Sequence, residues 1–169
     1  MTISMYQASV PVFLQLLGNL KGVLAKGAAH AEARKFDTMV LFNARLAPDM
    51  LPLVKQVQIA SDNAKGCGAR LAGVDPPKYD DNEASYAQLG ERIDKTLLFL
   101  KSLKPAQIDG SEGRDIVLKF PNNTFEFKGL GYLTNFALPN FTFHVVTAYN
   151  ILRHNGVPIG KSDYLGGRG

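Results

Sequence analysis

Two polar residues, Asn140 and His144, stand four positions apart on a segment that otherwise repeats apolar residues at helical spacing. Residues four apart lie on one face of a helix, so both side chains interrupt the same apolar stripe. Gln56 interrupts a second stripe, and it follows Asp49 and precedes Asn63 at seven-residue steps. Polar groups inside a core cost free energy unless they are partnered. We therefore expect Gln56, Asn140 and His144 to meet inside the fold.

Two interpretations of these residues stay open. The first is a pocket of Gln56, Asn140 and His144 that binds a small molecule or a divalent metal, with His144 as the candidate metal ligand. The second is a core histidine that is satisfied by hydrogen bonds to the two amides. One imidazole with two amides is a poor set for zinc, which favours the second interpretation. His144 is also the side chain there whose ordinary pKa would suit a general base near pH 7.

The stripes predict four long helices that position these residues. The first begins near Val10 and loosens at Gly27. The second runs from Pro48–Asp49 to Gly73, and the third from about Glu83 to Leu103. The fourth runs from about Gly129 to Asn155, with a kink expected at Pro139 because proline lacks a backbone N–H.

The spacing of apolar residues along the sequence changes before the fourth predicted helix. Residues 115–120 and 124–127 no longer follow helical spacing and flank the Asn-rich turn Pro121-Asn122-Asn123, which predicts a β-hairpin. We therefore expect an all-α fold, an antiparallel four-helix bundle with a small β-hairpin before the last long helix. Residues 1–157 would form this single domain, and residues 158–169 a Gly-rich, partly frayed C-terminal tail.

Composition narrows the function classes. The 19 Lys and Arg residues exceed the 15 Asp and Glu residues by four, but they are spread along the chain, so no nucleic-acid partner is expected. No apolar run approaches the ~18 residues of a membrane span, and no signal peptide is visible, so we expect a cytoplasmic protein without a membrane partner.

Three further features favour scaffold roles over chemistry. The single cysteine, Cys67, lies on an apolar stripe and is expected to be a packed, inert thiol. Ion pairs are expected between Arg45 and Asp49 and between Arg153 and Asp62.

Longer motifs carry a resemblance. They are Asn43-Ala44-Arg45-Leu46-Ala47-Pro48-Asp49-Met50, Leu138-Pro139-Asn140-Phe141 with His144, and Ile151-Leu152-Arg153-His154-Asn155-Gly156. With these the chain resembles a bacterial family of unknown function, the one numbered nineteen-ninety-three, over nearly its whole length. That family is similar to the DinB/YfiT-like superfamily of four-helix metalloenzymes.

The resemblance implies a bundle that holds a divalent metal through three histidines, often in a homodimer, with relatives that act as thiol transferases or isomerases. The superfamily's ligand positions fall near Gln56 and on Asn140 and His144, so amides replace two of the three histidines. Three hypotheses follow. The protein binds a small ligand or keeps only the scaffold; it is a divalent-metal-dependent enzyme of the thiol-transferase or isomerase type; or it is a structural homodimeric interaction module.

Overall fold

The computed structural model describes residues 2–167 and is mainly helical, with one small antiparallel sheet. Four helices are long: α1 (Val10–Ala33), α3 (Leu53–Ala72), α4 (Tyr86–Ser102) and α7 (Leu138–His154). The shorter elements are α2 (Thr38–Phe42), α5 (Pro105–Ile108), β1 (Asp115–Lys119), β2 (Thr124–Lys128), α6 (Gly129–Tyr132), the π-helical turn η1 (Leu133–Ala137) and α8 (Lys161–Leu165).

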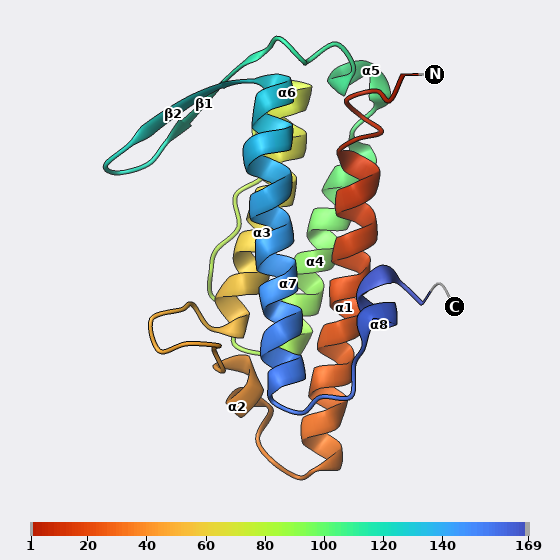
Figure 1. Cartoon of the computed structure of the whole chain (residues 1–169), viewed down its shortest axis with the longest axis vertical. Coiled ribbons are helices and arrows are strands. Elements are labelled where there is room, and N and C mark those ends of the chain that lie inside the picture. The colour runs from red at the N-terminus through yellow and green to blue at the C-terminus, as the bar shows by residue number, and fades with distance from the viewer. Residues whose placement is uncertain (1, 168–169) are drawn as a thin grey trace.

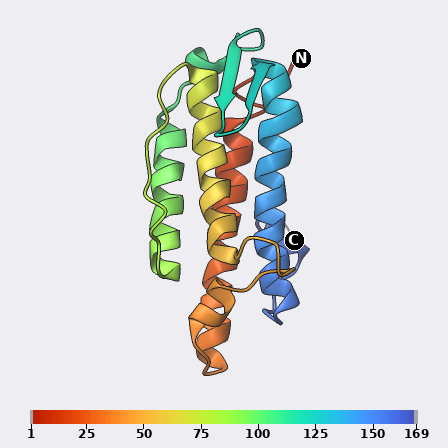
Figure 2. The same ribbon diagram turned by 90° about the vertical axis from the view of Figure 1, so that its left-hand side faces the viewer.

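The four long helices lie side by side and bury their apolar stripes against one another (Figure 1). Helix α3 packs on both α7 and α4, and α1 packs on α4 and α7. Neighbours α1 and α3 run in opposite directions, but α3 and α4 run in the same direction (Figures 1 and 2). The expected antiparallel arrangement is therefore wrong for this pair. Residues 74–85 return along the length of the helices before α4 begins, which a short loop could not do.

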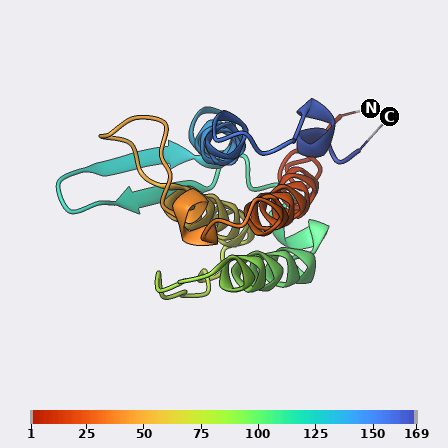
Figure 3. The ribbon, with the colours of Figure 1, turned by 90° about the horizontal axis from the view of Figure 1, so that it is seen from below.

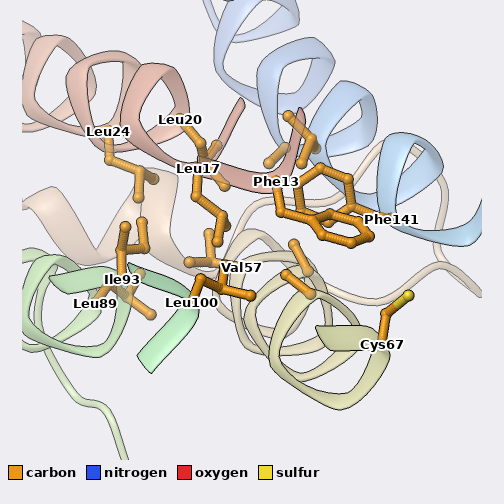
Figure 4. Packing of buried hydrophobic residues seen from close by; sticks show 14 of the residues in the cluster. Phe13, Leu17, Leu20, Leu24, Val57, Cys67, Leu89, Ile93, Leu100 and Phe141 are labelled. Carbon is orange, nitrogen blue, oxygen red and sulfur yellow. The ribbon is translucent and has the colours of Figure 1, made fainter. Parts of the chain in front are cut away.

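The core lies between these helices and follows the predicted stripes. Phe13, Leu17 and Leu20 of α1 meet Ile93 of α4 and Phe141 of α7 (Figure 4). Phe13 and Phe141 pack edge to face with their ring centroids 4.9 Å apart. This contact joins α1 to the helix that carries Asn140 and His144.

Two predicted helix boundaries are wrong. Helix α1 does not loosen at Gly27 but continues to Ala33, because Gly27 lets α7 approach closely: a Cβ there would lie 3.0 Å from Leu152. Helix α3 begins at Leu53 rather than at residues 48–49, since Pro52 in extended backbone precedes it. Its predicted end is confirmed at Gly73, which adopts a left-handed φ of 69°.

The β-hairpin is confirmed, with Ile116 paired to Phe127 and Leu118 to Phe125. It projects beside the end of the helices where α3 ends and α6 begins (Figure 1). The segment that follows is helical from Gly129 to His154, as predicted, but residues 133–137 form a π-helical turn immediately before Pro139. In this wider turn the backbone N–H of Leu138 donates to the carbonyl oxygen of Leu133, just before a proline that has no N–H to donate.

Residues 161–165 form α8 and pack on α1, so the predicted fraying is wrong for them. Asn19 donates from Nδ2 to the carbonyl oxygen of Tyr164 at 2.8 Å, and Lys26 pairs with Asp163. Figure 3 shows α8 beside α1. The last two residues of the predicted tail, 168–169, lie outside the described residues, and the domain boundary at residue 157 stays a prediction. No helix among residues 2–167 combines the length and apolar character needed to cross a membrane.

Candidate functional site

The structure brings Gln56 of α3 and His144 of α7 into direct contact. Nδ1 of His144 lies 2.7 Å from Oε1 of Gln56, and both side chains are buried. Gln56 also donates from Nε2 to the carbonyl oxygen of Leu51 at 2.9 Å, which fixes the orientation of its amide. Because an amide oxygen only accepts, Nδ1 of His144 must carry the hydrogen. The pair therefore links α7, α3 and the loop before α3.

This contact also fixes the tautomer of His144. With the hydrogen on Nδ1, the neutral ring keeps its lone pair on Nε2, which has no hydrogen-bond partner within residues 2–167. Burial lowers the pKa of His144 below its usual value, because desolvation penalises the imidazolium. The ring is thus favoured in its neutral form at pH 7.

Asn140 does not join this pair. One turn before His144, it lines a separate hollow of about 200 Å³ between α3, α6–α7 and the hairpin, which we call the α3–α7 hollow. The side chain of Asn140 makes no hydrogen bond to any residue in the range 2–167. Ile59 and Asn63 of α3 form one wall, and Leu118 of the hairpin and Phe136 of η1 form others.

Asn63 adds an unusual polar atom to this hollow. Its Oδ1 atom is buried and has no hydrogen-bond partner among the described residues. Buried polar atoms are nearly always hydrogen-bonded, to protein or to water, so the unpaired Oδ1 of Asn63 costs the folded chain free energy. Two amides and several apolar side chains therefore converge on one hollow.

Two residues that the sequence pattern did not indicate, Arg70 and Tyr132, line the same hollow. Nη1 of Arg70 donates to the hydroxyl oxygen of Tyr132 at 3.1 Å. Arg70 lies seven residues after Asn63, which lies seven after Gln56, so extending the seven-residue step by one member would have found it. Tyr132 and the hairpin residues could not be found this way, because only the fold brings them to α3.

A larger hollow of about 350 Å³ lies beside Arg92 of α4, but its central charges are already paired. The Arg92 side chain is 1% exposed and contacts Asp62 at 2.7 Å, Glu83 at 2.9 Å and Asp81 at 3.1 Å. These ion pairs hold the 74–85 crossover against α3 and α4. We assign this cluster a structural role.

Both predicted ion pairs are wrong. Asp62 pairs with Arg92 and Lys65, while Arg153 donates to the carbonyl oxygen of Val157. Arg45 donates to the carbonyl oxygen of Pro48, and no ion pair to Asp49 forms. In both cases the arginine satisfies a nearby backbone carbonyl at the end of a helix or in a loop. The prediction of a packed Cys67 is confirmed, since this residue is fully buried and burial raises its thiol pKa.

The residues present do not fit the three-histidine metal site of the DinB/YfiT-like superfamily. His144 is the imidazole available, and the oxygen of Gln56 is occupied by the Nδ1 hydrogen of that ring. No group of three or more His, Cys, Asp or Glu side chains within residues 2–167 is arranged to hold a metal ion.

Comparison with known proteins then places the chain in a family. The model of the domain of unknown function DUF1993 matches residues 5–165. The chain belongs to the DUF1993 family. A crystal structure of a DinB family member protein from Shewanella denitrificans has 41% sequence identity to this DUF1993 protein and a TM-score of 0.86. That match covers 95% of this chain and 90% of the other. No curated protein matches.

Proposed function

We propose that this DUF1993 protein binds a small organic molecule in the α3–α7 hollow, on a DinB/YfiT-like four-helix bundle that has lost its resident metal. The single observation that carries the proposal is the hollow itself, in which apolar side chains stand beside the polar side chains of Asn63, Arg70 and Asn140. Ligand sites are typically concave and mainly apolar, with a few polar groups that fix orientation.

The energetics of Asn63 support this assignment. An unpaired buried polar atom costs about 1–3 kcal/mol relative to a hydrogen-bonded one. Because Oδ1 of Asn63 is closed to solvent, a ligand would recover that energy once the side chain turns this oxygen toward the hollow. Asn140 offers both an amide oxygen and an amide nitrogen beside it.

The His144–Gln56 pair acts as a brace in this proposal. Asn140 lies one turn from His144 on α7, and Ile59 lies about one turn from Gln56 on α3. The hydrogen bond between His144 and Gln56 thus sets the spacing of the two helices next to the hollow. Preorganised walls reduce the ordering cost of binding.

The alternative of a metal-dependent enzyme depends on His144 recruiting further ligands. With Nδ1 committed to Gln56, only Nε2 remains for a metal, and a single imidazole gives weak coordination. The small-ligand proposal needs no such recruitment. A homodimer stays a prediction from the resemblance and a cytoplasmic location one from the sequence, and sedimentation over a range of concentrations would test the first.

An NMR titration tests the proposal. Phenylacetamide, a neutral probe with an aromatic body, should shift the backbone amide signals of α3, η1 and the hairpin residues around the hollow. Ile59→Trp should abolish these shifts, because the indole fills the hollow. Leu98→Trp is the matched control, since Leu98 of α4 is 72% exposed and lies outside the hollow. Shifts centred elsewhere, or equal loss in both variants, would contradict the proposal.

A further inference from the structure

Arg70 is a half-buried cation without an acidic partner. No carboxylate among residues 2–167 forms an ion pair with it, and its one side-chain hydrogen bond goes to Tyr132. A guanidinium carries five N–H donors, and this bond uses one of them. An arginine in this state is suited to a planar anion, which it can bind through two parallel hydrogen bonds.

The position of Arg70 is fixed by its neighbours. Its guanidinium lies over Gly66, one turn earlier on α3, and a Cβ on Gly66 would come 2.5 Å from Nη1. The glycine therefore leaves the space in which the arginine side chain folds back along the helix toward Asn63. The Tyr132 ring supports it from the other side, 6.0 Å from the guanidinium carbon to the ring centroid.

Tyr132 supplies a second donor at the same place. Its hydroxyl oxygen accepts from Arg70, while no acceptor among the described residues takes its own hydrogen. Burial raises the pKa of Tyr132 to about 12, so the hydroxyl keeps that hydrogen at neutral pH. Arg70 and Tyr132 thus present N–H and O–H donors side by side.

The aromatic side chains that line the hollow determine which uncharged part of a ligand fits beside the donors. Phe120 of the hairpin lines the hollow, is 50% exposed and packs edge to face on Phe125, which leaves an apolar surface in the wall. Phe136 contributes a ring from η1, 5.5 Å from the ring of Phe127. Such walls favour an aromatic or branched apolar group.

The charge of Asp62 limits the charge of the ligand. This carboxylate also lines the hollow, and it is held there by Arg92 and Lys65. A doubly charged phosphate would be repelled by it more strongly than a singly charged carboxylate. From this arrangement we propose that the α3–α7 hollow binds an apolar monocarboxylate, whose carboxylate is held by Arg70 and Tyr132 and whose body lies against the aromatic side chains of the hairpin and η1. This inference rests on the proposed function and deepens it.

Calorimetric titration with phenylacetate, phenylacetamide and phenyl phosphate tests the inference. Wild-type protein should bind phenylacetate at least about tenfold more tightly than phenylacetamide, because a charge-assisted hydrogen bond is stronger than a neutral one. Phenyl phosphate should bind more weakly than phenylacetate. Equal affinity for the acid and the amide, or preference for the phosphate, overturns the assignment and leaves small-ligand binding standing. Absence of binding by all three overturns both proposals.

Two arginine variants test whether Arg70 causes the preference for the carboxylate over the amide. Arg70→Gln should bring the affinity for phenylacetate down to that for phenylacetamide, while the affinity for the amide is kept. Arg34→Gln, at an exposed arginine after α1, should leave both affinities unchanged. An acid preference that persists in Arg70→Gln overturns the inference. Should that variant fail to fold, Tyr132→Phe reports on the same contact, and the comparison of acid with amide in the wild-type chain needs no variant.

Discussion

Replacing Gln56 by leucine tests whether the His144–Gln56 hydrogen bond braces the two helices beside the hollow. The substitution strands the Nδ1 hydrogen of His144 in the core, 2.7 Å from where the amide oxygen lay. It also releases the carbonyl oxygen of Leu51, but Leu51 is 47% exposed, so water can replace that bond. The cost therefore comes mainly from one buried, unpaired donor, about 1–3 kcal/mol.

A double-mutant cycle isolates this contribution. His144→Leu alone strands the oxygen of Gln56, at a similar cost, whereas the double variant leaves two apolar side chains in contact. Replacing both hydrogen-bonding partners by apolar groups of similar shape is close to neutral, so the two single costs should not add. We expect a coupling energy of about 1–2 kcal/mol between the two positions.

The assay is urea denaturation at pH 7.5, where the imidazole is neutral, followed by the far-ultraviolet circular dichroism of the helices. The midpoint should fall in each single variant and partly recover in the double variant, with an unchanged slope. Additive losses of stability in the double variant would refute the argument that the two side chains stabilise each other.

Three further predictions concern the Arg92 cluster, the pH dependence of His144 and the buried thiol of Cys67. Arg92→Met should lower the free energy of unfolding by about 3 kcal/mol in urea denaturation, since it leaves Glu83 and Asp62 without their shared cation. The control Lys21→Met breaks an ion pair that is about half exposed and should cost under about 1 kcal/mol. Similar losses in both variants would contradict the structural role of the Arg92 cluster. Because the pKa of His144 is lowered in the folded state, the contribution of this residue to stability is full above the ordinary pKa of 6.5 and is lost as pH falls toward the folded-state pKa. The free energy of unfolding, measured from pH 7.5 to 5.5, should therefore decline less in His144→Leu than in wild type. Parallel declines would show that His144 does not cause the loss of stability. Cys67 should react with a thiol reagent only in denaturant, because it is fully buried and burial raises its pKa; fast labelling of the folded protein would show that the core around it opens.

Local sequence signals predicted the elements well where one residue decides the backbone. Gly73 ends α3 in the left-handed conformation, as its place after the apolar stripe predicted. Gly27 misled the prediction, because a glycine that ends a helix and a glycine that admits a neighbouring helix look alike in sequence. Only the packing of Leu152 against it separates the two cases.

The candidate site was predicted in part. Stripe periodicity indicated that Gln56 points toward His144, and the structure places their side chains in contact. Periodicity could not show that Asn140, on the same stripe, turns into a different hollow just after the π-helical turn. Arg70 and Tyr132 are 62 residues apart, and their contact depends on how the hairpin and η1 dock on α3. Such long-range placement has no local signal.

In the proposed function, the α3–α7 hollow binds small molecules without a metal. The most direct test of this function is calorimetric titration of phenylacetate into protein stripped with a chelator, repeated after adding zinc. We predict the same binding constant in both titrations. Binding that appears only after zinc is restored would contradict the account and favour the metal-dependent alternative centred on His144.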